Sequence, residues 1–241
     1  MTERGSLVFE PAARSRRAGA WSLARGQGPV VAAVFVPAVL VLVAVALAAE
    51  RSGREVSFFT REPVSALTVG GATCTGPSCS YVGVVSNLGV LLWCAAAAGC
   101  FLAASLVVRG RRSPLLYAGV LTTALLADDL FLLHEGVYAL VVEERLVFGL
   151  YALALVGYVV AFRRFLRATT PWLFAAACAL FAVSLVADER WAGHHLLEDG
   201  SKFLGIVAWS TYFLAAAAAE LRALADGAPG GHARARRPPQ A

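Results

Sequence analysis

The sequence is poor in charged residues and holds only one lysine and one methionine. Of its 241 residues, 15% are Asp, Glu, Lys or Arg, against roughly 25% in an average soluble domain. Apolar residues make up 59% of the chain, and the mean hydropathy is +0.67. Such a chain has too little polar surface to coat a soluble globule. We therefore predict an all-α, multi-pass integral membrane bundle.

Sequence signals for nucleotide or nucleic-acid binding are also missing. The chain has no glycine-rich phosphate loop and no dinucleotide fingerprint. The net charge of +5 comes from short basic clusters between apolar runs, a pattern that reports membrane topology. We expect no nucleic-acid partner. The expected partners are the lipid bilayer and a lipid, small molecule or ion at the outer face.

Six apolar runs are long enough to cross about 30 Å of hydrocarbon. Two of them are preceded by a hydroxyl residue and a proline, Ser113-Pro114 and Thr170-Pro171, which is typical of a helix start. The six predicted spans are residues 30–49, 81–108, 115–134, 146–165, 172–187 and 203–221.

The basic residues predict the orientation of these spans. Fifteen arginines lie in the N-terminal segment, in alternate connections and in the tail, whereas six basic residues lie on the opposite side. The positive-inside rule then places both termini in the cytoplasm and the protein in the cell membrane. Residues 1–29 would be a disordered basic arm, residues 30–222 the membrane domain with an outer loop at 50–80, and residues 223–241 a disordered tail.

A cleaved signal peptide is the alternative for the first span. Basic residues, an apolar run and the small residues Ala46-Leu47-Ala48 imitate one. The apolar run is nearer 20 residues than the 7–15 of a signal peptide, which favours a retained helix.

Two cysteines lie in the outer loop among turn residues. Cys74 and Cys79 are flanked by Gly70, Gly71, Gly76 and Pro77. A disulfide is allowed on the outer side of the membrane, and the turns could bring the two sulfur atoms together. A metal-binding pair is the alternative, although no histidine accompanies them.

The third predicted span contains the most unusual polar stretch. Asp128, Asp129, His134 and Glu135 interrupt an apolar run, and a charge at mid-helix costs roughly 2.5–3.5 kcal/mol on insertion scales. On a helix Asp128 and Glu135 share a face, while Asp129 points about 100° away. The stretch therefore presents polar groups to at least two neighbouring helices or to a cavity.

A second polar cluster runs from His194 to Lys202. In a helix, His194 and Glu198, His195 and Asp199, and Glu198 and Lys202 are each four residues apart. Such pairs are equally a metal-ligand spacing or a helical salt bridge. Alternatively, Ser201 or Asp199 could simply cap the sixth span. Lys202 is the only lysine, which suggests a need for a compact ammonium that pairs with Glu198 or with the aspartates of the third span.

These polar residues fall in one outer layer when the spans alternate in direction, together with Ser86 at the start of the second span. Intramembrane carboxylates usually face a bundle interior or a water-filled cavity. We therefore predict an outward-facing polar cavity among the second, third and sixth spans, to which the fifth span contributes its end. The candidate catalytic residues are Asp128, Asp129, Ser86 and Lys202; the candidate metal ligands are His134, Glu135, His194, His195, Glu198 and Asp199.

Histidines and carboxylates at this depth favour a metal-dependent intramembrane hydrolase, in which Zn²⁺ or another divalent metal activates water. Ser86-Asn87 and the run Leu126-Ala127-Asp128-Asp129-Leu130 resemble patches of the alkaline ceramidase group of intramembrane hydrolases. That resemblance implies a zinc site and carries over Ser86 and Asp128 or Asp129. It carries over no histidine, because the group's Ser-x3-His and His-x3-His spacings are missing here.

Two other functions fit the same residues. A proton- or cation-coupled transporter could use Asp128, Asp129, Glu198 and Lys202 as its ion site. A structural or accessory subunit could use a Lys202–Asp pair to hold its helices together.

Overall fold

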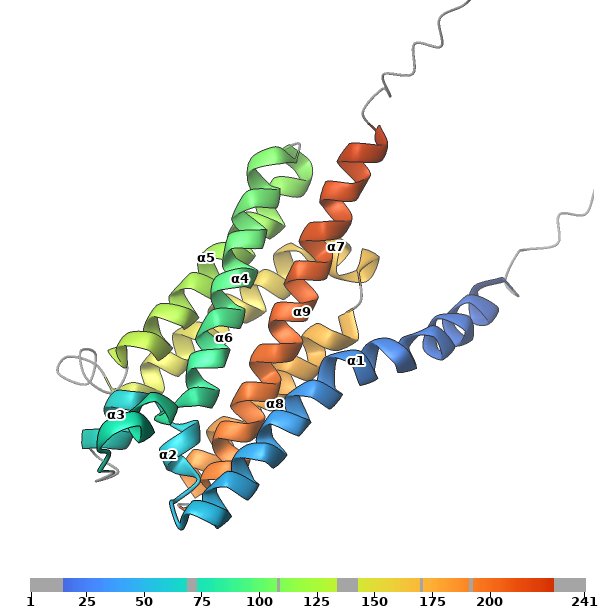
Figure 1. The fold of residues 1–241 in the computed structure, drawn as a ribbon. Helices are drawn as coiled ribbons and strands as arrows, with labels where there is room; N and C mark the ends of the chain where they lie inside the picture. Colours follow the sequence, from blue (N-terminus) through green and yellow to red (C-terminus); the bar gives the residue numbers. More distant parts are fainter. Residues whose placement is uncertain are drawn as a thin grey trace, which may run out of the picture.

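The computed structural model describes residues 15–68, 73–107, 109–133, 143–169, 171–190 and 193–227, and these are helices joined by short connections, with no strand among them (Figure 1). The predicted all-α class is confirmed. The elements are α1 Ser15–Ser52, α2 Ser57–Thr60, α3 Pro63–Thr68, η1 Gly76–Tyr81, α4 Val84–Leu106, α5 Arg109–Phe131, α6 Glu144–Ala161, α7 Arg163–Ala168, α8 Pro171–Arg190 and α9 His195–Gly227.

Among the described residues, five helices, α1, α4, α5, α8 and α9, are long and apolar enough to cross a membrane, and α6 is a shorter apolar helix. A multi-pass membrane protein is therefore supported. Several predicted bounds were wrong. Residues 15–29 extend α1 instead of forming a disordered arm, and α9 is helical at both ends beyond the predicted 203–221.

The predicted start at Ser113-Pro114 was also wrong, because α5 begins at Arg109 and Pro114 lies inside its second turn. Pro114 lacks the backbone N–H and so removes only one hydrogen bond near the start of the helix. By contrast, α8 begins at Pro171, as predicted.

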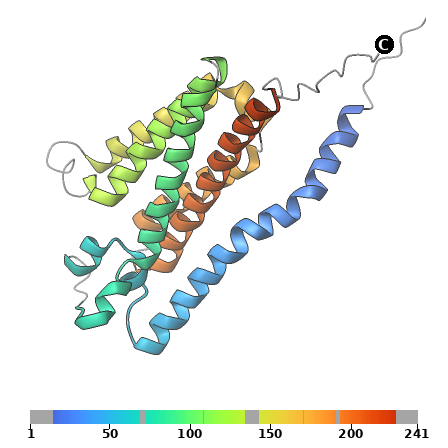
Figure 2. The ribbon, with the colours of Figure 1, turned by 45° about the horizontal axis from the view of Figure 1, so that its top comes forward.

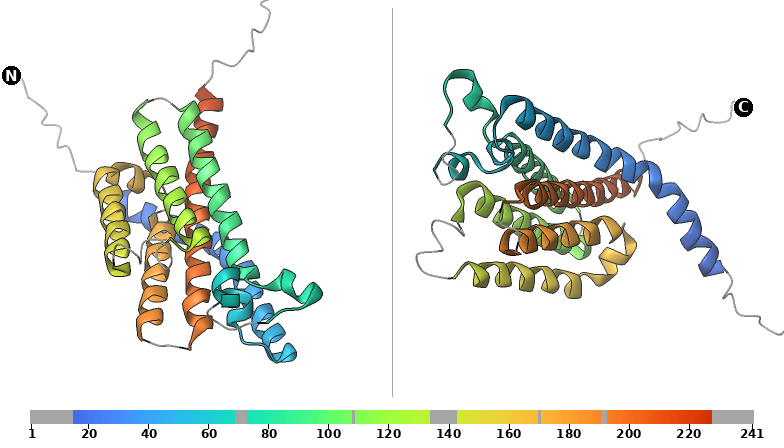
Figure 3. Two further views of the ribbon diagram at one scale, coloured as in Figure 1. Left: turned by 90° about the vertical axis from the view of Figure 1, so that its left-hand side faces the viewer. Right: turned by 90° about the horizontal axis from the view of Figure 1, so that it is seen from below.

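The centre of the bundle is α9. Figure 3 shows it between α1 on one side and α8 on the other, and it also packs along α4. Trp209, Tyr212 and Phe213 of α9 are buried against Phe174 of α8 and Tyr158 of α6. These aromatic rings fill the middle of the bundle with apolar surface.

The first helix packs on α9 through a narrow stripe. Ala38, Val45 and Ala49 are buried, and their spacing places them on one helical face. Most other side chains of the described part of α1 are exposed and apolar, as expected of a lipid-facing helix. The beginning of α1 leans away from the bundle (Figure 2).

Residues 57–68, which comprise α2, α3 and their connection, form a cap over one end of α4 and α9. We call it the outer cap because it belongs to the predicted outer loop. Phe58 and Phe59 bury their rings in a second apolar core with α1 and α9. The chain then reaches α4 through Gly83, whose φ of +63° favours glycine and whose N–H donates to the carbonyl of Phe58 at 3.0 Å.

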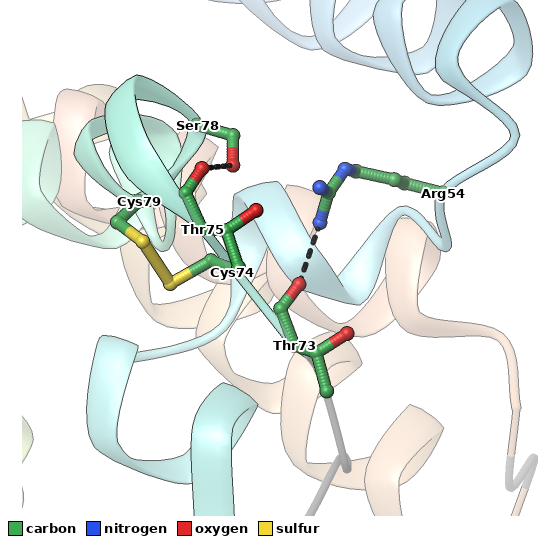
Figure 4. The surroundings of a disulfide bond; sticks show 6 residues. All are labelled: Arg54, Thr73, Cys74, Thr75, Ser78 and Cys79. Atoms are coloured by element: carbon green, nitrogen blue, oxygen red, sulfur yellow. Dashed lines mark hydrogen bonds between the residues drawn. A yellow bond between two sulfur atoms is a disulfide. The ribbon is translucent and has the colours of Figure 1, made fainter.

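The predicted disulfide is confirmed beside this cap. Cys74 and Cys79 are bonded, with their Cα atoms 5.1 Å apart (Figure 4). Arg54 donates to the carbonyl of Thr73 at 3.0 Å and lies over the ring of Phe58. The loop is thereby tied to the end of α1.

Candidate functional site

Three charged groups from distant parts of the sequence meet at the end of the bundle that bears the outer cap. Lys202 Nζ of α9 lies 2.7 Å from Glu62 Oε1 of the outer cap and 2.5 Å from Asp129 Oδ1 of α5. Asp129 is buried, and the Lys202 side chain is 31% exposed. A compact ammonium carries three donors, so it can serve two carboxylates at once. We call these three residues, with Thr60, Asp199 and Ser86 around them, the Lys202 site.

Three consecutive residues of the cap each pair with α9. Thr60 Oγ1 donates a short hydrogen bond to Asp199 Oδ2, Arg61 Nη2 lies 3.7 Å from Glu198 Oε1, and Glu62 accepts from Lys202. Extended backbone at Arg61 (φ −71°, ψ 161°) separates α2 from α3. The cap is therefore seated on α9 by polar contacts as well as by its phenylalanines.

A small cavity lies inside the Lys202 site. Its volume is about 10 Å³, which is close to what one water molecule requires. The polar residues that line it are Thr60, Glu62, Ser86, Asp129, Asp199 and Lys202. Val85, Phe203 and Ile206 supply its apolar wall. Side-chain oxygen atoms from the cap, α4, α5 and α9 therefore line the cavity.

The charges around the cavity do not balance. Glu62, Asp129, Glu198 and Asp199 supply four carboxylates, and Arg61 and Lys202 supply two cations. Burial works to raise the pKa of Glu62, but the Lys202 ammonium outweighs it, so this pKa lies below its ordinary value of 4.5. An excess of carboxylates favours the uptake of protons or cations.

Four of the residues predicted from the sequence meet in this cavity: Ser86, Asp129, Asp199 and Lys202. Asp128 is also buried on α5 but does not belong to the described lining. Glu198 lies at the margin, between Arg61 and His195. His194 is exposed. The predicted His134 and Glu135 lie outside the described residues.

The pairs within α9 differ from those predicted. His195 Nδ1 lies 3.6 Å from Glu198 Oε2, three residues on, whereas Asp199 pairs with Thr60 and Lys202 turns to Glu62 and Asp129. The outer cap supplies the partners that the i, i+4 pattern had assigned within the helix. In the described part of the chain, no three His, Cys, Asp or Glu side chains are arranged to hold a metal ion. Those residues therefore do not fit the zinc site that the ceramidase resemblance implies.

Sequence reasoning missed the whole contribution of the cap: Thr60, Arg61 and Glu62. Their stretch of the sequence is short and lacks a clear helical periodicity, so the sequence does not indicate their depth. One sequence feature could have marked Glu62 as a candidate. It is a carboxylate directly before a proline, in the same predicted outer loop as the disulfide.

The opposite end of the bundle holds a separate ion pair. Arg111 Nη1 of α5 lies 2.5 Å from Glu220 Oε1 of α9, and Glu220 is buried. Between this pair and the Lys202 site lies the aromatic core, where Trp209 donates to the hydroxyl of Thr122 at 3.0 Å. The larger cluster of ionisable groups in the described bundle therefore lies at the end that bears the outer cap.

Comparison with known proteins gives a family without an assigned activity. No curated protein and no solved structure matches the chain. One family model, described as a domain of unknown function (DUF8692), matches residues 33–216. This match covers the outer cap, the Lys202 site and the described helices from most of α1 to most of α9. The chain belongs to the family DUF8692.

Proposed function

We propose that this protein is a proton- or cation-coupled transporter of the cell membrane that takes up its ion at the Lys202 site. One observation carries the proposal: a single ammonium is shared by two carboxylates beside a cavity for one water. Ionisable groups at such depth are costly and usually belong to ion or proton pathways.

The proposal includes six spans with both termini in the cytoplasm. The α6 helix of 18 residues is about 27 Å long at 1.5 Å per residue, and it runs from the end that bears the cap to the end that bears α7. The start of α1 and the end of α9 lie toward the other end from the cap. Fifteen of the 21 basic residues fall on the side assigned to the cytoplasm.

The chemistry of the cavity favours a hard ion. Its polar lining consists of carboxylates, hydroxyls and one ammonium, with neither histidine nor cysteine. Oxygen donors suit protons, Na⁺, Mg²⁺ or Ca²⁺ more than softer transition metals. A cation that enters would compete with Lys202 for Glu62 and Asp129. Displacement of Lys202 from Glu62 would weaken the attachment of the outer cap to α9.

In this proposal the described arrangement is the outward-facing one, because the aromatic core separates the Lys202 site from the inner end. Trp209, Phe213 and Tyr158 are buried between the Lys202 site and the inner end. Delivery to the cytoplasm would require α9 to move relative to α4 or α8, as in alternating access. In this proposal, loss of the cap contacts is the event that permits such movement.

A metal-dependent intramembrane hydrolase is the second candidate, favoured because Ser86, Asp129 and Lys202 line the same cavity. With no fitting metal trio among the described residues, no step through a metal is derived. Near-stoichiometric zinc in the purified protein, lost in Asp129→Ala and His195→Ala, would favour this candidate over transport.

Ion binding is tested on the full chain in lipid nanodiscs. The melting temperature is measured while pH, Na⁺, Mg²⁺ and Ca²⁺ are varied one at a time. We expect at least one ion to shift the melting temperature of the natural protein and of Glu189→Gln, an exposed outer carboxylate. The shift should disappear in Glu62→Gln and Asp129→Asn. Equal responses in all four proteins would refute the assignment.

A further inference from the structure

A compact basic surface lies at the opposite end from the Lys202 site. Arg163, Arg164 and Arg167 of α7 are all exposed. None of them forms an ion pair with another residue whose side chain the structure describes. We call these three arginines the α7 surface. Three neighbouring cations on six residues repel one another, so an anion close by would stabilise them.

The helix that presents these arginines is held in place by the bundle. Leu166 is buried in the main core, and Phe162 and Phe165 pack against that core. Thr169, directly after α7, shares a hydrogen bond of 2.8 Å with the Tyr212 hydroxyl of α9. The arginines are therefore displayed on an ordered helix that has one apolar and one cationic face, as interfacial helices do.

The α7 surface continues directly from a lipid-facing helix. Val156 and Val160, near the end of α6, are 57% and 67% exposed. The chain bends at Phe162, and the arginines follow at once. A cation one turn beyond exposed apolar side chains lies at the depth of the lipid phosphates.

We propose that the α7 surface binds the headgroups of anionic phospholipids in the cytoplasmic leaflet. Guanidinium groups bind phosphate oxygens through paired hydrogen bonds. Their position at the edge of the lipid-facing surface favours a lipid over an acidic protein. The leaflet assignment rests on the proposed orientation, whereas the preference for anionic headgroups does not.

The test compares two variants that lose the same charge. One is R163Q/R164Q/R167Q; its matched control, R51Q/R145Q/R190Q, removes three exposed arginines near the other end. Each full-length protein is placed in nanodiscs of phosphatidylcholine with one-fifth phosphatidylglycerol, and the lipids that stay bound are counted by native mass spectrometry. A juxtamembrane arginine contributes about fivefold in lipid affinity. We expect bound phosphatidylglycerol to fall at least tenfold in the first variant and less than threefold in the control.

Two more variants separate the remaining explanations. R163K/R164K/R167K keeps the charge and should keep most of the bound phosphatidylglycerol; its melting temperature and that of the glutamine variant show whether the fold is intact. Lys202→Met should bind phosphatidylglycerol like the natural protein, so failure of the ion site does not mimic failure of the lipid site. Equal loss of bound phosphatidylglycerol in both glutamine variants, or no loss in either, would overturn the proposal. Binding of an acidic peptide instead of phosphatidylglycerol at the α7 surface would also overturn it.

Discussion

The substitution Lys202→Met should expose how strongly the ion cluster holds the outer end together. It removes the ammonium and leaves Glu62 and Asp129 facing each other without a cation. Removal of one partner from a buried ion pair costs about 3–5 kcal/mol. Because the Lys202 side chain is 31% exposed, partial hydration lowers our expectation to about 2–3 kcal/mol. For a chain of this size that is a fall in melting temperature of about 4–12 °C.

The assay is thermal unfolding of the full chain in nanodiscs, followed by far-UV circular dichroism. The matched control is Arg145→Met, which breaks the exposed pair with Glu189 and should cost less than about 1 kcal/mol. Combining Lys202→Met with Glu62→Gln and Asp129→Leu should recover most of the loss, because neutral replacement of a whole buried ion cluster is often tolerated. A Lys202→Met protein as stable as the control would refute the reasoning.

The same substitution should reverse the pH dependence of stability. The pKa of Glu62 is lowered in the folded protein, so its contribution is present above about pH 4.5 and is lost as the pH falls through the folded-state value. Without Lys202, burial is the largest influence left on Glu62 and should raise its pKa, so the variant should gain stability in acid and lose it as the pH rises. Melting temperatures that change with pH in the same way in both proteins, between pH 3.5 and 7, would contradict this.

Two further substitutions test how the cap is seated. Gly83→Ala should lower stability by about 2 kcal/mol or more, because a Cβ there would lie 2.5 Å from the carbonyl oxygen of Arg61. Gly53→Ala is its control, with a similar positive φ but nothing within 4 Å, and it should cost only about 1 kcal/mol; equal losses would count against the tight contact. Thr60→Val should cost about 1–3 kcal/mol, since it removes the buried hydrogen bond to Asp199. Unchanged melting of Thr60→Val would show that this bond does not seat the cap.

Much of the fold could be predicted because membrane helices are signalled by apolar runs. The sequence predicted that Lys202 pairs either with Glu198 or with an aspartate of the third span, because these groups fall at one depth. The structure confirms that pair as Lys202–Asp129. The disulfide followed from two nearby cysteines among turn residues.

The cap could not be predicted, because its contacts are long-range and its sequence lacks periodicity. Glu62 and Lys202 are 140 residues apart, and nothing in a short loop fixes the depth at which its side chains lie. The predicted His195–Asp199 pair is missing for the same reason: Thr60 of the cap donates to Asp199, and His195 lies beside Glu198 instead. The helix bounds were wrong where α1 and α9 extend beyond their most apolar residues.

The most direct test of ion coupling is charge movement across proteoliposomes. The natural protein, Lys202→Met/Asp129→Asn and the Arg145→Met control are reconstituted at equal density, and currents are recorded on solid-supported membranes after jumps in pH, Na⁺, Mg²⁺ or Ca²⁺. A transporter that uses the Lys202 site should give a current for at least one of these ions. That current should persist in the control and vanish in the double variant. Silence of the natural protein toward all four ions, or equal currents in all three proteins, would contradict the proposed function.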